Sequence, residues 1–317
     1  IGKMCKQCES KPVYKLNNGK QLCSKCFTRY YEKKVFRTIR QYNLIQKGDR
    51  IAVAASGGKD STTLLYLLNR FSKDRRFCTV EAIAIDEGIH GYRNKTLEDL
   101  RRFCKKEKIK LHIFSYKEEF GFSLDEALKK MQDKGIKLTS CHVCGILRRY
   151  LLNKKSREMK FNKLATAHNL DDEAQTILMN QFKGNVALSA KLGPKTGVLE
   201  DSNFAQRIKP LYFHTEKENM TYAFTHKIVP GFVECPHQAS YRFMIRDFLN
   251  KFEAQNPGIK QAIVQSFLDT LPILKEKYGR AASESGNGNA LQSCSRCGEP
   301  SSKDVCKACE VVEMLKN

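Results

Sequence analysis

The chain has 317 residues, which is enough for one sizeable core with small appendages. Its Lys and Arg residues exceed its Asp and Glu residues by 22, and this surplus favours a polyanionic partner such as nucleic acid over a Lys-rich solubilising surface. No run of about 18 uncharged apolar residues is present, which excludes a membrane-spanning helix, and the first residues lack the apolar core of a signal peptide. We therefore expect a cytoplasmic protein without a membrane anchor.

The first 34 residues are predicted to form a small metal-binding module. They contain two CxxC pairs, "CKQC" and "CSKC", and four thiolates from two tight turns can close a tetrahedron around zinc. A redox-active or iron-binding role is the rarer alternative. A module of this size holds no core without its metal, so we expect a structural zinc site. Its ligands would be Cys5, Cys8, Cys23 and Cys26.

Residues 35–279 are predicted to form an α/β domain, because strand-like and helix-like segments alternate along them. This alternation favours a parallel sheet with right-handed crossovers and with helices on both faces. The predicted strands are 50–56, 79–85, 110–116 and 163–168. The predicted helices are 61–71, 96–108, 123–135, 171–182, 240–255 and 259–279, and two further apolar runs cover 207–213 and 231–235.

A small, polar and Gly-rich segment, residues 280–293, is predicted to be a flexible linker. It leads to a second module at 294–317, which again carries two CxxC pairs. Four thiolates at this spacing predict a second zinc site. Its ligands would be Cys294, Cys297, Cys306 and Cys309.

Five of the thirteen cysteines lie outside the two modules. Cys78 and Cys104 fall within apolar strand and helix patterns and are predicted to be core thiols. The others are the pair Cys141 and Cys144 in "CHVCG" and the single Cys235 in "VECPH". In a chain that looks cytosolic, such cysteines indicate metal binding or catalysis rather than disulfides.

The segment "SGGKDS", residues 56–61, follows the first predicted strand and opens the next helix. It does not match the GxxxxGK[ST] pattern, so a Walker loop is excluded. Two glycines let the backbone turn sharply toward a ligand, while Ser56, Ser61 and Lys59 add hydroxyl donors and a positive charge. The helix that follows directs its positive end at the same place. The segment therefore predicts an anion-binding loop, and a plain strand–helix turn is the alternative.

The motif SGGKDS is similar to the PP-loop of the ATP pyrophosphatases, which activate an oxygen as an adenylate and release pyrophosphate. Five further segments and both CxxC modules resemble the TtuA/NcsA group of tRNA uridine 2-thiolases, relatives of the eukaryotic cytoplasmic tRNA 2-thiolation protein. This resemblance covers nearly the entire chain. The segments are "IDEGIHGYR" (85–93), "CHVCGILRRYLL" (141–152), "ATAHNLDDEAQT" (165–176), "IKPLY" (208–212) and "VECP" (233–236).

The resemblance implies a Rossmann-like PP-loop fold of the HUP type that binds ATP with magnesium. Asp60 and Asp172 would serve Mg²⁺ or proton transfer, although Asn169 with an acidic first turn also has the pattern of a simple helix cap. The implied nucleotide-binding residues are Ala54, Ser56, Gly57, Gly58, Lys59, Asp60, Ser61, Asp86, Gly91, His168 and Asp172.

In this group Cys141, Cys144 and Cys235 would bind a 4Fe-4S cluster whose fourth iron stays open and carries the sulfide. An open coordination position is what separates catalytic from structural metal sites. Two alternatives remain at this point. His142 or His237 would complete a Cys₃His zinc site, or Cys141 and Cys235 would form a persulfide–disulfide couple without iron.

Arg148 follows Cys144 by one helical turn, and Arg149 is its neighbour. By the family pattern Arg148 is a catalytic residue that steadies negative charge on the uracil oxygen or on the leaving phosphate. The alternative is a basic helix surface that touches the RNA backbone.

The implied reaction is adenylation of the O2 atom of a tRNA uridine, followed by attack of sulfide on C2. Its implied partners are tRNA, a sulfur donor (free sulfide or a ubiquitin-like thiocarboxylate carrier) and a second copy of the chain. About 30 Asn and Gln residues do not fit a hyperthermophile, so the wobble uridine is favoured over the T-loop uridine. The competing classes are a small-molecule PP-loop ligase or sulfur-metabolism enzyme and a purely nucleic-acid-binding zinc protein.

Overall fold

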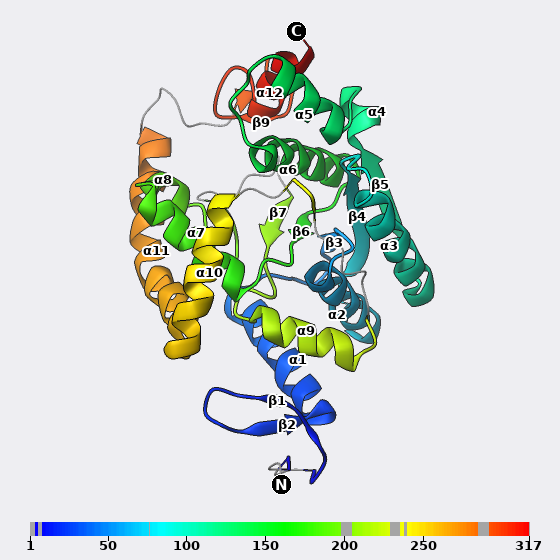
Figure 1. The fold of residues 1–317 in the computed structure, drawn as a ribbon, viewed down its shortest axis with the longest axis vertical. Coiled ribbons are helices and arrows are strands. Elements are labelled where there is room, and N and C mark those ends of the chain that lie inside the picture. Colours follow the sequence, from blue (N-terminus) through cyan, green and yellow to red (C-terminus); the bar gives the residue numbers. More distant parts are fainter. Residues whose placement is uncertain are drawn as a thin grey trace.

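A five-stranded parallel sheet forms the centre of the molecule (Figure 1). The computed structural model describes residues 4–5, 8–75, 77–197, 205–228, 235–237, 240–284 and 292–316. In the strand order β5-β4-β3-β6-β7, later strands lie on both sides of β3, and β3 is parallel to both of its neighbours. The predicted parallel α/β architecture is therefore confirmed. The strands are β3 (Arg50–Ala54), β4 (Thr79–Asp86), β5 (Leu111–Ser115), β6 (Lys163–Ala165) and β7 (Gln206–Ile208).

Each face of the sheet packs against its own set of helices, because successive side chains of a strand point to opposite faces. Val53 belongs to the core beneath the first set, whereas Ala52 belongs to the core beneath the second. The first set is α1 (Ser24–Gln41), α2 (Lys59–Arg75), α3 (Arg93–Glu107) and α9 (Glu216–Thr225). The second set is α4 (Tyr116–Phe120), α5 (Leu124–Asp133), α6 (Ser140–Glu158) and α12 (Lys307–Lys316).

A third core joins three helices, and a short fourth helix packs against two of them; all four lie beside the β7 edge of the sheet (Figure 1). Helix α11 continues to Glu284, five residues beyond the predicted end, and residues 285–291 of the predicted linker lie outside the described residues. The apolar run 207–213 forms only a short strand before a turn, and residues 231–234 of the other run are also outside the described residues. The four helices are α7 (Leu170–Phe182), α8 (Val186–Ser189), α10 (Ser240–Gln255) and α11 (Ile259–Glu284).

The two cysteine modules lie at opposite ends of the molecule (Figure 1). The first is an antiparallel hairpin of β1 (Pro12–Lys15) and β2 (Gln21–Cys23), and α1 begins at the next residue. Because α1 carries Cys26 and then Tyr31 and Val35 of the central core, one helix connects this module rigidly to the α/β domain.

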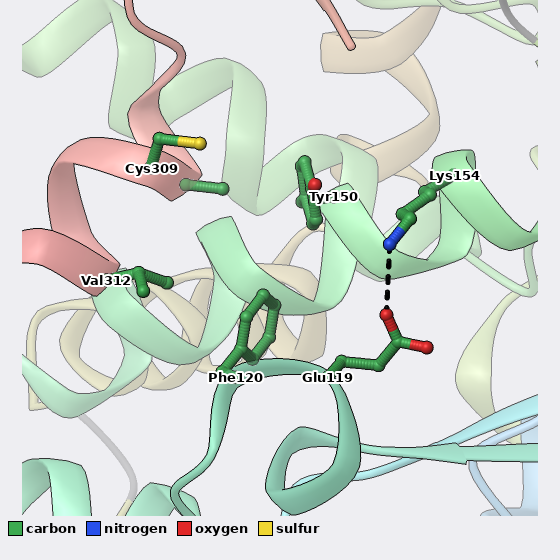
Figure 2. Close-up of a pocket in the computed structure, with 7 residues that line it drawn as sticks. Glu119, Phe120, Tyr150, Lys154, Cys309 and Val312 are labelled. Carbon is green, nitrogen blue, oxygen red and sulfur yellow. Dashed lines mark hydrogen bonds and ion pairs between the residues drawn. The ribbon is translucent and has the colours of Figure 1, made fainter. Parts of the chain in front are cut away.

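The C-terminal module consists of β8 (Gln292–Ser293), β9 (Pro300–Ser301) and α12, and it packs on α6 and α5. Arg157 of α6 forms an ion pair with Glu299, and Lys134 donates to the carbonyl oxygen of Met314 at 3.2 Å. A pocket of about 160 Å³ remains between α12, α4 and α6, with Tyr150 on its wall (Figure 2). Among the described residues, no helix has the length and apolarity needed to cross a bilayer.

Candidate active site

The loop between β3 and α2 contains the predicted anion-binding motif. Its two serine hydroxyls, of Ser56 and Ser61, lie 3.0 Å apart, and the N–H of Gly58 donates to Ser56 Oγ at 3.3 Å. Gly57 has a φ of +84°, and a Cβ there would lie 2.4 Å from the carbonyl oxygen of Thr96. Only glycine fits this position, so the sharp turn and the tight approach of α3 both depend on it.

The charged residues of this loop contact helix α9. Lys59 Nζ lies 2.6 Å from Glu216 Oε1 and 3.3 Å from Asp60 Oδ2, and Asn219 donates to Asp60 Oδ1 at 2.8 Å. Burial raises the pKa of Asp60, although the Lys59 charge and the Asn219 hydrogen bond oppose that rise. The loop cation is therefore paired with carboxylates that an anionic ligand would have to replace.

His168 and Asp172 lie where β6 leads into α7. The side chain of Asn169 accepts a hydrogen bond from the Asp172 N–H at 3.1 Å, and the Asp172 carboxylate accepts one from the Asn169 N–H at 3.2 Å. The helix-cap interpretation is therefore correct for Asn169. Burial raises the pKa of Asp172 to about 6, and the charge of Asp60 contributes to the rise. The charge of one carboxylate therefore acts on the other, and two carboxylates from different elements are what a magnesium site would need.

The remaining residues of the predicted nucleotide site lie at the ends of the two central strands. Ala54 is the last residue of β3, and Asp86 is the last residue of β4. The Asp86 carboxylate accepts from the Gly88 N–H at 2.9 Å, which fixes the turn after β4, and Gly91 follows with a φ of +72°. Adjacent parallel strands end at the same edge, so these residues border the SGGKDS loop.

Cys141 and Cys144 lie in the first turns of α6, and the segment that carries Cys235 meets them there. Ser140 Oγ donates to the carbonyl oxygen of His237 at 2.6 Å, and Cys141 Sγ lies 3.5 Å from the same oxygen. Burial raises the pKa of Cys144 and of Cys235, and charge on another thiol of the trio adds to each rise. Two segments almost 100 residues apart in the chain therefore bring three thiols into one neighbourhood.

This trio differs in geometry from the two terminal cysteine sets. In each terminal set all four sulfurs lie within 4.8 Å of one another, and no third set of this kind occurs in the described part of the chain. Zinc at about 2.3 Å from each thiolate needs such close sulfurs. A four-iron cluster spreads its ligands, because each thiolate binds a different iron. The wider trio therefore fits a cluster better than a zinc site completed by His142 or His237.

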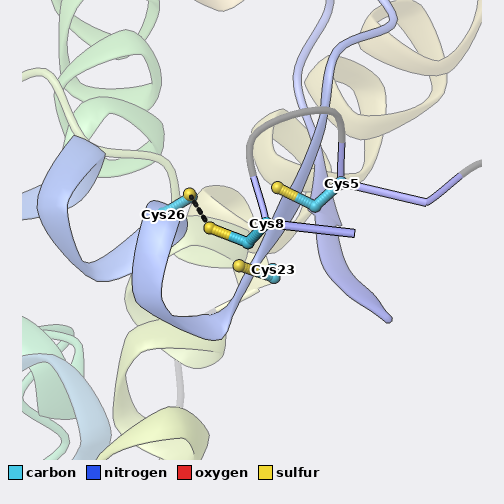
Figure 3. Close-up of side chains that lie close together, drawn as sticks. All are labelled: Cys5, Cys8, Cys23 and Cys26. Atoms are coloured by element: carbon cyan, nitrogen blue, oxygen red, sulfur yellow. Dashed lines mark hydrogen bonds between the residues drawn. The ribbon is translucent and has the colours of Figure 1, made fainter. Parts of the chain in front are cut away.

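The terminal sets have the compact arrangement of zinc sites. Figure 3 shows the four sulfurs of the first set directed toward one another, with Cys8 Sγ and Cys26 Sγ 3.5 Å apart. In the second set burial opposes ionisation, but backbone N–H donors, including that of Cys306, lower the pKa of Cys294 to about 6. Such donors stabilise the thiolate form that binds metal.

A chain of side-chain contacts leads from the loop toward the trio, and it runs through two buried residues, Glu87 and Arg93, which the sequence analysis did not single out. Arg93 donates to the carbonyl oxygen of Ser56 at 2.6 Å and forms an ion pair with Glu87 at 2.9 Å. Glu87 also lies 3.6 Å from Arg148 Nη1. Burial lowers the pKa of Arg148, but the charges of nearby Cys144 and Glu87 outweigh this effect and raise it above its usual value. Contacts of these residues therefore connect the SGGKDS loop to the helix that carries Cys144.

The family model described as "PP-loop domain" matches residues 30–252. The chain belongs to the PP-loop domain family. A curated relative from Dictyostelium discoideum, "Cytoplasmic tRNA 2-thiolation protein 1", is 33% identical over 99% of this chain and 84% of its own length. The "tRNA-5-methyluridine(54) 2-sulfurtransferase" of Pyrococcus horikoshii is 33% identical over 96% of this chain and 92% of its own.

Among solved structures, this PP-loop protein is similar to the U34-tRNA thiolase NcsA from Methanococcus maripaludis with its [4Fe-4S] cluster. The TM-score is 0.80 at 29% identity, and the match covers 99% of this chain and 96% of the other. The resemblance to the TtuA/NcsA group is confirmed, and the protein is an enzyme of that sulfurtransferase group.

Proposed function

We propose that this protein uses ATP to replace the O2 atom of a tRNA uridine with sulfur. The observation that carries the proposal is the junction of the trio Cys141, Cys144 and Cys235 with the SGGKDS loop through Arg93 and Glu87. A thiolase needs nucleotide activation and sulfur delivery at one base, and this junction supports both. The surplus of 22 positive charges supports tRNA as the substrate.

Activation of the base would use the loop residues. The backbone and hydroxyl donors of SGGKDS would hold the phosphates of ATP, and Lys59 would exchange Glu216 for a phosphate oxygen. Asp60 and Asp172 would hold Mg²⁺. The uridine O2 then attacks the α-phosphate, the bond to pyrophosphate breaks, and the base becomes an adenylate. AMP is a far better leaving group than the original amide-like oxygen.

Sulfur delivery would use the trio. When bound to the three thiolates, a 4Fe-4S cluster supplies an open iron position for the sulfide that enters the base. Cys141 is exposed, which supports access of a large substrate from this side. Sulfide attacks C2 and AMP departs, while Arg148 stabilises the negative charge on the departing phosphate.

We infer that the substrate is the wobble uridine, the reaction of the U34-tRNA thiolase that matches over nearly the whole chain. The Pyrococcus relative acts on position 54, so the T-loop uridine is the second candidate. The two terminal cysteine sets would hold one zinc ion each, and the modules that contain them would bind the tRNA through its shape and its phosphate charge. A cytoplasmic location, a homodimer, and free sulfide or a thiocarboxylate carrier as the donor complete the proposal.

Mass spectrometry of tRNA from a deletion strain tests the proposal. The wild-type gene should restore 2-thiouridine at position 34, and Cys235→Ser should not. Cys78→Ser is the matched control, because Cys78 is a buried thiol that precedes the amino end of β4, whereas the site lies at the carboxyl ends of the strands. Restoration at position 54 would establish the T-loop alternative. Full activity of iron-free protein would show that a cysteine persulfide, and not a cluster, delivers the sulfur. Unchanged thiouridine in the deletion strain would overturn the proposal.

A further inference from the structure

Three arginines on helix α6 and strand β7 lie near enough for their charges to influence one another. Arg148 and Arg149 are neighbours on the helix, and Arg207 lies in the middle of β7. The next strand residue, Ile208, belongs to the core on the opposite face of the sheet, so Arg207 points to the α6 side. We propose that Arg149 and Arg207 form a binding site for one phosphodiester of the substrate RNA, beside the nucleotide that is modified.

Arg149 and Arg207 have no anionic partners among the described residues. Arg148 has Glu87 at 3.6 Å, but no carboxylate among the described residues lies within 4.0 Å of Arg149 or Arg207. Arg207 Nε is buried and has no hydrogen-bond partner. An unpaired cation in such surroundings is unfavourable unless a ligand neutralises it. The two residues are therefore complementary to an anion that the described part of the chain does not supply.

Mutual repulsion supports the same conclusion. Burial, followed by the charges of Arg149 and Arg148, lowers the pKa of Arg207 to about 10. Burial and the charge of Arg148 also lower the pKa of Arg149. Arg148 and Arg149 keep exposed surface, so a ligand from solution can reach them. A guanidinium group can donate two parallel hydrogen bonds to phosphate oxygens, so two neighbouring arginines are suited to bind one phosphodiester.

The location favours RNA over ATP as the source of the phosphate. The guanidinium of Arg149 folds back toward Gly145, where an added Cβ would lie 3.0 Å from Nη1, and Gly145 is the residue after Cys144. The ATP phosphates already have a cradle at the SGGKDS loop with its own cation, Lys59. β7 is two strands away from β3, which leads into that loop. A phosphate beside the cysteines belongs to the nucleotide that receives sulfur.

The inference rests on the proposed tRNA reaction, and its test separates the two. Binding of substrate tRNA is measured as a function of salt for wild type, Arg149→Gln, Arg207→Gln and the control Arg102→Gln. Arg102 is an exposed arginine on α3, so its variant loses the same charge elsewhere. Each site variant should bind tRNA about tenfold more weakly, and the salt slope should fall by about one phosphate contact. The control should keep the wild-type slope.

A chemical change in the RNA identifies the contact. A methylphosphonate at the phosphate next to the target uridine should weaken binding to wild type by about tenfold and should not weaken binding to Arg207→Gln further. Thermal melting of the free protein addresses folding, because removing an unpaired cation that is repelled by its neighbours should leave the melting temperature unchanged or raise it. A lower melting temperature for both variants would assign the arginines a structural role and overturn the inference.

The remaining outcomes are also decisive. If Arg207→Gln weakens ATP binding and leaves tRNA binding unchanged, the site belongs to the nucleotide and the inference is wrong. If both variants bind and thiolate tRNA like wild type, the inference fails while the proposed function stands. If the wild-type protein binds tRNA no better than a DNA duplex of equal charge and forms no thiouridine, the proposed function fails first and the inference fails with it.

Discussion

The Asp125 carboxylate accepts a hydrogen bond from Nε2 of His237 at 2.7 Å, and its other oxygen accepts one from the backbone N–H of His90 at 2.8 Å. One side chain of α5 therefore holds both the loop after β4 and the segment that carries Cys235. Ser140 reinforces the second contact by donating to the His237 carbonyl oxygen. The position of Cys235 relative to α6 thus depends on residues far from it in the sequence.

Asp125→Ala should release this segment and impair metal binding by the trio. Residues that orient a metal ligand typically contribute tenfold or more to affinity or activity, so we expect a loss of about tenfold in thiolation and a clear drop in iron content. Iron and acid-labile sulfide are measured after anaerobic reconstitution. Asp133→Ala, an exposed carboxylate at the end of the same helix, should behave like wild type. Normal iron content in Asp125→Ala would contradict the positioning role.

The pairing of Lys59 with Glu216 should limit ATP affinity in the free enzyme. Glu216 is half exposed and competes with phosphate for the Lys59 ammonium, which it approaches to 2.6 Å. Glu216→Gln should therefore tighten ATP binding about threefold to tenfold, whereas Lys59→Gln should weaken it by a similar or larger factor. Isothermal titration with ATP and Mg²⁺ measures both. Glu118→Gln, an exposed substitution on α4, should leave the affinity unchanged, and weaker binding by Glu216→Gln would refute the competition.

The residues that sequence motifs could predict are those whose role depends on a local segment. SGGKDS encodes its own turn, since the Gly58 backbone and the two serine hydroxyls interact within six residues. Glu216 and Asn219 could not be predicted as part of the site, because they reach the loop only when α9 packs on α2. Glu87 likewise gains its partner Arg148 through tertiary packing, which no local pattern encodes.

The fold shows a similar division. Alternating strand and helix patterns predicted the parallel sheet, but α9 was missed even though Thr215 and Glu218 form a capping box that marks its start. The capping box was a usable signal. The continuation of α1 from the cysteine module into the core was harder to foresee, because its buried residues, such as Tyr31, contact Asn219 almost 190 residues later.

His214 should make the stability of the protein depend on pH. Burial, with a contribution from the charge of Lys34, lowers the pKa of His214 to about 3, and Glu218 offsets only part of this. The unfolded chain binds a proton near pH 6.5 that the folded protein does not bind, so the free energy of unfolding must fall as pH drops from about 6.5 to about 3. Between pH 7 and pH 5 the expected loss is about 2 kcal/mol.

Urea unfolding of His214→Gln tests this linkage. The variant has no imidazole to protonate, so its free energy of unfolding should vary less between pH 7 and pH 5 than that of wild type, whatever its absolute stability. His142→Gln removes an exposed histidine and serves as the control for the rest of the chain. Equal pH slopes for wild type and His214→Gln would show that the buried ring is not the source of the acid sensitivity.

Leu315 should make the thermal stability of the cysteine trio depend on the packing of the C-terminal module. Its side chain is fully buried in the core that α12 shares with Leu147 and Leu151 of α6, and Cys144 packs against the same core. Leu315→Ala removes several methyl groups there and should cost about 2–5 kcal/mol in stability. Because α6 carries two of the three thiols, the iron absorbance should then be lost at a lower temperature than in wild type, while zinc stays bound by its four unchanged cysteines.

Leu188→Ala makes the same change at an exposed site on α8 and should melt like wild type. If the two variants lose iron at the same temperature, the module stabilises α6 too weakly to influence the site.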